Sequence, residues 1–178
     1  LKDLKIKKIN DTFKSPIKWK KDFKNQNLCP GVSGRYFKNI KNVESPKWLQ
    51  DRLKAIGLRP ISALVDITNY VTFDLGRPLH VYDADKVSGN LTMRLAEKDE
   101  ECLALNEVNY KCTEDMIVIS DDNSKLHGIG GVMGGLDSGC SIETNNVFLE
   151  VALFDPISVT KTGRKLNLQS DARYRFER

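Results

Sequence analysis

The stretch LVDITNYVTFDLGRPLHVYDADKV, residues 64–87, is the part of the sequence around which the predicted fold is organised. It begins with apolar residues at helical spacing, and the adjacent polar residues Thr68 and Asn69 follow one turn later. A Gly-Arg-Pro break ends the helical pattern, and His80 comes next, in a segment where polar and apolar residues alternate. This order predicts a helix and a histidine that line one wall of a polar pocket. The alternative interpretation is that Thr68 and Asn69 bond back to their own helix and that His80 is a satisfied loop histidine.

The composition is typical of a soluble globular domain. The 178 residues are enough to bury a core, and 40% of them are hydrophobic and 29% charged. No apolar run is as long as a membrane span and no signal peptide opens the chain, so we expect a cytoplasmic protein with no membrane partner.

The four cysteines form no CxxC pair and have no matching histidine spacing, which argues against a metal site and favours free thiols. Because the chain starts with Leu1 and stops without a helix-ending signal, we expect a piece of a longer protein.

Positive charge is concentrated at the two ends of the chain. Residues 1–24 hold nine lysines against three aspartates, and residues 161–178 hold six Lys or Arg against two acids, while the middle is acidic. Basic ends can meet a phosphate backbone, although a solvated lysine-rich surface explains the same pattern. We expect residues 1–28 to be a basic N-terminal segment that belongs to a linker or a neighbouring module, and residues 29–178 to form the main domain.

The hydrophobic patterns predict an α+β fold in which strands dominate the middle and helices lie before and after them. A first helix has Ser45 as its N-cap and Gly57 as its stop signal, with an apolar stripe made of Trp48, Leu49, Leu53 and Ile56. A second helix spans residues 60–75, and Asp155 and Ser170 are predicted to cap two final helices. Alternation with period two predicts mixed or antiparallel strands at residues 91–96, 101–108, 109–112 and 116–120.

A strongly apolar strand, NVFLEVALF at residues 146–154, contains a single carboxylate, Glu150. Because side chains alternate between the two faces of a strand, Glu150 shares its face with Phe148 and Ala152. That face is itself apolar, so the pattern favours a buried carboxylate with a polar partner over one that faces solvent. Such a partner can be structural, as in a salt bridge or a backbone contact, or it can be a ligand.

Five glycines occur within GIGGVMGG, residues 128–135. This density lets the backbone approach a ligand closely or adopt left-handed conformations. A phosphate-binding P-loop ends in Lys followed by Ser or Thr, whereas this stretch continues as Leu-Asp-Ser, so we exclude that motif. The alternative is that the glycines permit tight packing of strands.

Taken together, these stretches resemble one protein family. DITNYV followed by LGRPLHVYDADKV, then GIGGVMGG, NVFLEVALFDPISVTKTGRKLNL and SDARYRFER, occur in the order typical of the B3/B4 region of the bacterial phenylalanyl-tRNA synthetase beta subunit. The resemblance extends from about Cys29 to Arg178. It implies a B3/B4-like editing domain, which hydrolyses tyrosine mistakenly esterified to the phenylalanine tRNA.

The resemblance also implies the setting in which the domain acts. The parent enzyme would be an aminoacyl-tRNA synthetase that ligates phenylalanine to its tRNA in the cytoplasm, with alpha and beta subunits assembled as alpha2-beta2. Its ATP and Mg²⁺ would act in other parts of the enzyme, and this fragment would hold no cofactor or metal. The partner of the domain would be the phenylalanine tRNA mischarged with tyrosine.

Four positions match the part of the family's site that binds the amino acid. Glu150 matches the glutamate that accepts a hydrogen bond from the tyrosine hydroxyl, and Gly134 matches a glycine whose backbone lines the same pocket. Ser170 and Ala172 match positions of the downstream wall. Many family members have threonine where this chain has Ser170, which keeps the hydroxyl and lacks the methyl group.

Three positions match the part of the site that acts on the ester. His80 matches the histidine near the scissile bond, and Thr68 and Asn69 match a pair on the neighbouring helix. We expect these residues to orient a water molecule and the terminal ribose, whose own hydroxyl can assist. Positioning of this kind supplies much of the acceleration that ester hydrolysis needs.

Two other functions are compatible with parts of the sequence. A catalytically silent module could position tRNA or contact another subunit, but such a module would tolerate the loss of pocket residues that this chain retains. A tRNA-binding module of a different RNA-processing enzyme would have a basic central face, which the acidic middle of this chain does not provide.

Overall fold

The computed structural model describes residues 9–24 and 27–178 and has an α+β fold, as the sequence predicts. The described residues form three sheets. The five-stranded sheet contains, in spatial order, β1 (Trp19–Asp22), β4 (Leu91–Leu95), β7 (Ile117–Ser120), β8 (Leu126–Ile129) and β9 (Met133–Gly134). The three-stranded sheet contains β2 (Gly31–Phe37), β10 (Val147–Leu153) and β3 (Leu79–Asp83), with β10 at its centre. A small hairpin pairs β5 (Glu101–Leu103) with β6 (Asn109–Lys111).

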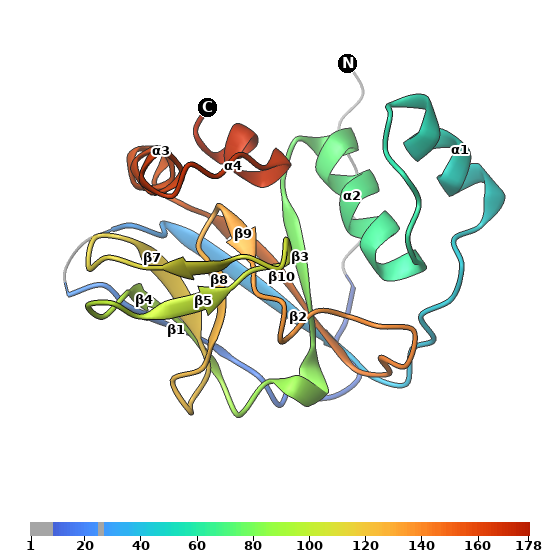
Figure 1. Ribbon diagram of the computed structural model, residues 1–178. Helices are drawn as coiled ribbons and strands as arrows, with labels where there is room; N and C mark the ends of the chain where they lie inside the picture. The colour runs from blue at the N-terminus through green and yellow to red at the C-terminus, as the bar shows by residue number, and fades with distance from the viewer. Residues whose placement is uncertain (1–8, 25–26) are drawn as a thin grey trace, which may run out of the picture.

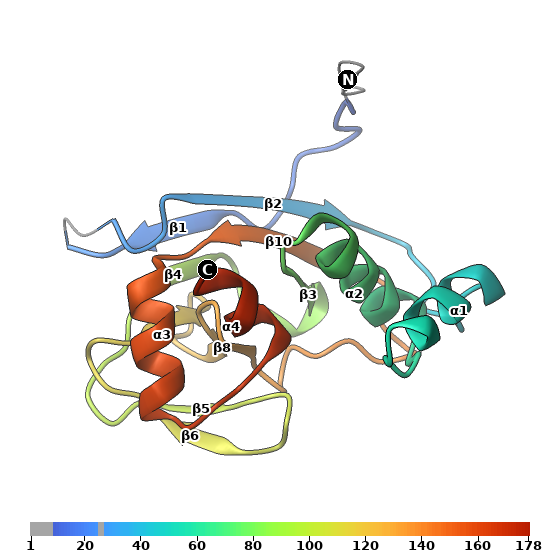
Figure 2. The same cartoon turned by 90° about the horizontal axis from the view of Figure 1, so that it is seen from above.

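The helices lie on the same side of the molecule, above the sheets in Figure 1. They are α1 (Lys47–Ala55), α2 (Ala63–Leu75), α3 (Pro156–Lys165) and α4 (Asp171–Phe176), with a short 3₁₀ turn, η1 (Ala84–Lys86), after β3. Seen from above, α3, α4, α2 and α1 follow one another across the molecule (Figure 2). Helix α2 contacts both α1 and β3, and α3 contacts both α4 and β7. Helix α2 is therefore packed against the strand that carries His80.

Part of the basic N-terminal segment belongs to the five-stranded sheet. Strand β1 forms an edge of that sheet and pairs in parallel with β4. Trp19 packs against the core, and its ring centroid lies 6.3 Å from that of Tyr82 and 5.7 Å from that of Phe148. Residues 1–8 and 25–26 of the segment lie outside the described residues.

Ser45 does not cap the first helix, so that prediction is wrong. The N-cap is Pro46, and the Ser45 hydroxyl instead donates a 2.5 Å hydrogen bond to the buried carboxylate of Asp66 on α2. The predicted apolar stripe is only half buried: Leu49 and Leu53 are in the interior, whereas Trp48 and Ile56 are 55% and 51% exposed. The sequence rule failed because the hydroxyl found a partner 21 residues away, which no local pattern shows.

The predicted ends of the helices follow the glycine signals. Gly57, with φ of +84°, comes after α1, and Gly76, with φ of +66°, caps α2. A positive φ is inexpensive only for glycine, so these positions fix where each helix stops. Gly76 turns the chain directly into β3, which carries His80. Asp155 and Ser170 cap α3 and α4 as predicted, by accepting hydrogen bonds from Ser158 N and Arg173 N.

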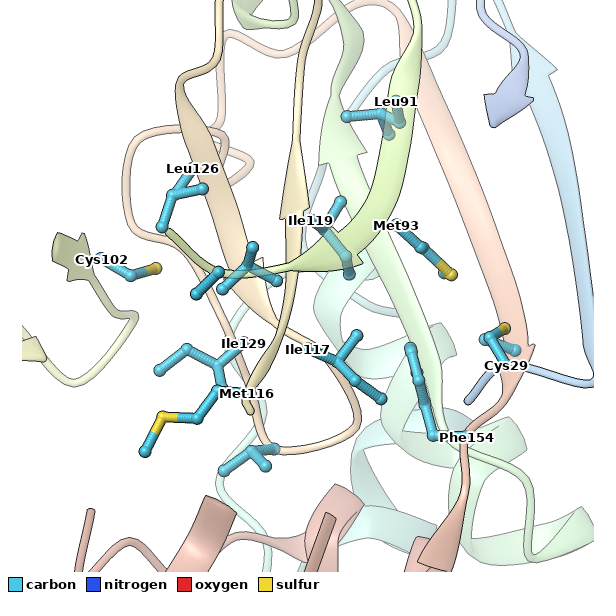
Figure 3. Packing of buried hydrophobic residues seen from close by; sticks show 14 of the residues in the cluster. Cys29, Leu91, Met93, Cys102, Met116, Ile117, Ile119, Leu126, Ile129 and Phe154 are labelled. Atoms are coloured by element: carbon cyan, nitrogen blue, oxygen red, sulfur yellow. The ribbon is translucent and has the colours of Figure 1, made fainter. Parts of the chain in front are cut away.

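The core lies between the sheets and beneath α3 and α4. Figure 3 shows Ile117 of β7 beside Phe154, the residue after β10, and Ile129 of β8 on the opposite face of the same sheet. Each of these three side chains is at most 5% exposed. Burial of such side chains contributes roughly 1.5–3 kcal/mol each and is the main source of stability for the fold. Phe154 thus connects the core to the strand that bears Glu150.

Candidate functional site

Glu150 is buried at the centre of the three-stranded sheet. It lies on β10 with Phe148 and Ala152 on the same inward face, and the residue is 5% exposed. Strand β10 is the central strand, with β2 and β3 on its two sides, so Glu150 lies away from the open edges of this sheet. The alternative of a solvent-facing Glu150 is wrong, and the pattern NVFLEVALF indicates a buried acid correctly.

The partner of Glu150 is Tyr82, a residue that the sequence analysis missed. Tyr82 is fully buried on β3, and its hydroxyl donates a hydrogen bond to Oε2 of Glu150. In the antiparallel ladder Glu150 is opposite His80, so Tyr82 is its diagonal neighbour on the same face, within reach of a long side chain. The available signal was the alternation in β3, which places Tyr82 on the face of His80. The register against β10 that completes the contact is not visible in the sequence.

Burial dominates the electrostatics of this pair. It raises the pKa of Glu150 to about 7, while the hydrogen bond from Tyr82 acts in the opposite direction. Burial and the adjacent Glu150 also raise the pKa of the Tyr82 phenol well above its ordinary value. Tyr82 therefore remains a donor at neutral pH, and both the charged and the neutral form of Glu150 are accessible there.

His80 lies beside the same pair and has an unused nitrogen. Its ring meets the ring of Tyr82 edge-to-face, with 4.4 Å between the centroids. The Nε2 atom is buried and has no hydrogen-bond partner within residues 9–24 and 27–178. Burial lowers the pKa of His80 to about 4, and the nearby His127 contributes in the same direction. The imidazole is therefore neutral at pH 7 and can accept or donate one hydrogen bond at Nε2, depending on its tautomer.

Gly134 allows β9 to approach His80 closely. A Cβ atom added at Gly134 would lie 2.2 Å from Cε1 of His80, a distance that real Cβ atoms do not tolerate. The Gly134 carbonyl accepts a 2.9 Å hydrogen bond from Leu105 N, which fixes this strand in place. A side chain at position 134 would have to displace the histidine ring. At Gly134 the glycine-rich stretch therefore permits close packing, as the alternative interpretation predicted, and this position lies at the edge of a candidate site.

A small cavity of about 70 Å³ connects these residues. Of the residues predicted to form the site, it is lined by His80, Gly134, Glu150 and Ala172; it is also lined by Tyr82, Met133, Phe154 and Phe176. The volume is sufficient for several water molecules. It is smaller than the roughly 300 Å³ at which pockets for drug-sized ligands begin. Entry of a whole tyrosyl side chain thus requires the rim of the cavity to move.

Thr68, Asn69 and Ser170 do not line this cavity. Thr68 is buried on α2, and its hydroxyl donates a 2.8 Å hydrogen bond to the carbonyl of Val65, the back-bond to its own helix. Asn69 is half-buried on the same helix. Ser170 caps α4 and donates a 2.5 Å hydrogen bond to the carbonyl of Val132, which does line the cavity. Ser170 thereby holds α4, with Ala172, against the cavity wall.

The described residues give little support for a metal site or for a cysteine nucleophile. No cluster of three or more His, Cys, Asp or Glu side chains that could hold a metal ion occurs among them. The four cysteines are all free thiols. Burial raises the pKa of the thiols of Cys102 to about 12 and of Cys112 to about 11, which makes them poor nucleophiles. In the part of the chain that the structure covers, no helix is long and apolar enough to cross a membrane.

Comparison with known proteins gives consistent results. The family model for the B3/4 domain matches residues 28–178. The chain is 54% identical, over its full length, to the phenylalanine–tRNA ligase beta subunit of Mesorhizobium japonicum and 51% identical to that of Paramagnetospirillum magneticum. It is 58% identical over 85% of its length to the corresponding subunit of Brucella suis. The chain spans about a fifth of the length of these relatives, 22% for the first two and 19% for the third.

A solved structure shows a similar fold. An N-terminal fragment of the phenylalanyl-tRNA synthetase beta subunit from Pyrococcus horikoshii superimposes with a TM-score of 0.57. The match covers 86% of this chain and 50% of that fragment, at 13% sequence identity. At this identity the likeness shows the fold alone.

Proposed function

Because the chain belongs to the B3/4 domain family of phenylalanine–tRNA ligase beta subunits, we propose that it is an editing domain that hydrolyses tyrosine wrongly esterified to the phenylalanine tRNA. The observation that carries this proposal is the buried carboxyl of Glu150 in the wall of a cavity that also contains an unpartnered His80 nitrogen. The carboxyl of Glu150 suits recognition of a phenol, and the nitrogen of His80 suits binding of a water molecule.

Recognition of the hydroxyl explains why such a domain is needed. An amino-acid pocket that is hydrophobic cannot strongly reject an analogue that merely adds a hydroxyl group. A second site that hydrogen-bonds this hydroxyl discriminates far better, because phenylalanine would leave the buried acceptor unpaired. In the proposed site Glu150 is that acceptor. A carboxylate that accepts from a phenol forms a charge-assisted hydrogen bond, which is stronger than one between neutral groups.

The proposed chemistry is hydrolysis by a positioned water molecule. His80, neutral at pH 7, would hold the water at Nε2 next to the ester. Its low pKa makes it a weak general base, so its contribution would be mainly orientation, with the ribose hydroxyl assisting. Thr68 and Asn69 lie on the adjacent helix, outside the cavity wall. In this proposal they contact the terminal ribose once the tRNA end is bound, and Gly134, Ser170 and Ala172 shape the walls.

The remaining features of the proposal concern the intact enzyme. Its ligation of phenylalanine to tRNA, with ATP and Mg²⁺, would take place outside this chain, which covers only about a fifth of its relatives' length. An alpha subunit in an alpha2-beta2 assembly, the phenylalanine tRNA and a cytoplasmic location are parts of the same proposal.

The test is release of tyrosine from mischarged phenylalanine tRNA by the intact enzyme. We expect Glu150→Ala to lose preference for tyrosine over phenylalanine, and His80→Ala to lower the rate about tenfold to a hundredfold through lost positioning. Gly31→Ala is a suitable control, because its added Cβ would make only an ordinary 3.5 Å contact with Leu153. Unchanged deacylation in both site variants would contradict the proposal and favour a catalytically silent module that positions tRNA or contacts another subunit.

A further inference from the structure

We propose that Tyr82 is a specificity-determining residue of the editing site, because its hydroxyl occupies one oxygen of Glu150 and holds the carboxyl as an acceptor for the phenol of the ligand. This inference rests on the proposed function and adds Tyr82 to the residues that recognise the ligand. Tyr82 is an internal phenol placed against the group that is proposed to recognise an external one.

The position of the Tyr82 hydroxyl is fixed by packing. The residue is fully buried, and pairing of β3 with β10 sets its backbone opposite Phe148. Its ring packs edge-to-face against Trp19, with 6.3 Å between the centroids, and against His80, with 4.4 Å. The hydroxyl cannot swing away from Glu150 without opening the core. Tyr82 is therefore a permanent donor, whether or not a ligand is present.

The hydrogen-bond inventory leaves room for one more phenol. A carboxylate can accept at both of its oxygens, and in the described chain only Tyr82 donates to the side chain of Glu150. Since the Tyr82 proton is already engaged, a ligand hydroxyl in the cavity finds an acceptor in Glu150 and no competing donor in Tyr82. A phenylalanyl group in the same position leaves the second oxygen of a charged Glu150 unpaired.

The surroundings show that Tyr82 is the main hydrogen-bonding influence on the ionisation of Glu150. The titratable groups that face Glu150 are Tyr82 and His80 on β3 and the thiol of Cys29, with His127 of β8 beyond His80. The cavity residues of β7, β9 and α4 carry no charge; they are Ile119, Met133, Gly134, Ala172 and Phe176. The hydrogen bond from Tyr82 lowers the pKa of Glu150 against the effect of burial. Removing the hydroxyl should therefore favour the neutral carboxyl, which is a weaker acceptor.

The experiment compares wild type with Tyr82→Phe in the intact enzyme, which removes only the hydroxyl. Release of tyrosine and of phenylalanine from charged phenylalanine tRNA is measured as kcat/KM between pH 6 and 9. In wild type we expect the preference for tyrosine to rise with pH through about 7, the pKa of Glu150. In Tyr82→Phe we expect the rise to move up by about one pH unit, with an approximately fivefold lower preference at pH 7, because the charged fraction of Glu150 would fall from about one half to about one tenth. Tyr36→Phe, the same change on β2 and outside the cavity, should leave the profile unchanged.

The Glu150→Gln variant supplies the second arm of the test. Its side chain does not ionise, so its preference should not depend on pH, and adding Tyr82→Phe should change it less than twofold. An unshifted profile in Tyr82→Phe, or an equal loss of preference in the Glu150→Gln background, would overturn the role of Tyr82. If Tyr82→Phe does not fold, a pH-dependent preference in Glu150→Gln still overturns the role of Tyr82. The pH dependence would then not come from Glu150, the group through which Tyr82 is proposed to act. Failure of the proposed function looks different, because wild type would then release neither amino acid at any pH.

Discussion

His80 on β3 and Glu150 on β10 are directly opposite each other in the antiparallel ladder that joins the two strands. Residues so paired have Cα atoms about 4.5–5.5 Å apart, set by backbone hydrogen bonds rather than by loop conformation. The group proposed to recognise a phenol and the group proposed to hold a water thus have a fixed spacing. Both point toward one cavity, which α4 and β9 close from the other side.

Replacing Glu150 by glutamine should stabilise the fold above pH 7. The folded-state pKa of about 7 exceeds the ordinary value of 4.5, so the folded protein loses stability as pH rises from about 4.5 through 7. A shift of this size corresponds to about 3 kcal/mol, a cost that a neutral amide avoids while it still accepts from Tyr82. Urea unfolding at pH 5 and pH 8 measures the effect. An advantage of Glu150→Gln over wild type that is equal at both pH values would contradict a buried, ionisable Glu150.

His80 should remain neutral well below pH 6. Its folded-state pKa of about 4 lies below the ordinary 6.5. The contribution of a neutral His80 to the free energy of unfolding is therefore complete above pH 6.5 and is lost as the pH falls from 6.5 through 4. Nuclear magnetic resonance of imidazole-labelled protein, with His80→Gln to assign the signal, checks this directly. We expect no titration of the His80 signal between pH 8 and 5.5, and a midpoint near 6.5 would refute the assignment of a desolvated ring.

Alanine at position 134 should damage the site more than alanine at position 31. The added methyl at Gly134 meets the His80 ring, whereas the one at Gly31 has space. We expect Gly134→Ala to cost about 1–3 kcal/mol in unfolding free energy and to reduce deacylation, because the ring must move. Thermal unfolding and the deacylation assay on both variants measure the two effects. Equal behaviour of Gly134→Ala and Gly31→Ala would argue against the close contact.

The contact between Ser45 and Asp66 should hold α1 against α2. Ser45→Ala leaves a buried carboxylate oxygen with one hydrogen bond fewer and should cost about 1–3 kcal/mol in unfolding free energy. Ser33→Ala, at an exposed position of β2, should cost much less. Denaturant unfolding of the two variants compares them. A loss in Ser45→Ala no greater than that in Ser33→Ala would mean that the contact is not stabilising.

The sequence predicts those features that local rules determine. Alternation in NVFLEVALF places Glu150 on a buried face because the side-chain period of a strand is two, and the glycine signals place the ends of α1 and α2. The fold class is confirmed as well. Tyr82 could not be assigned as the partner of Glu150, since that contact depends on the register between strands 68 residues apart. For the same reason the rotation of α2, which leaves Thr68 and Asn69 outside the cavity wall, could not be foreseen.

The most direct test of the central claim is a crystal structure of the intact enzyme with a non-hydrolysable tyrosyl-adenosine analogue. The account predicts that the rim of the cavity opens and that the phenolic oxygen lies about 2.5–2.8 Å from a carboxylate oxygen of Glu150, with the carbonyl of the analogue near Nε2 of His80. A bound analogue whose phenol contacts neither Glu150 nor the cavity beside it would contradict the account.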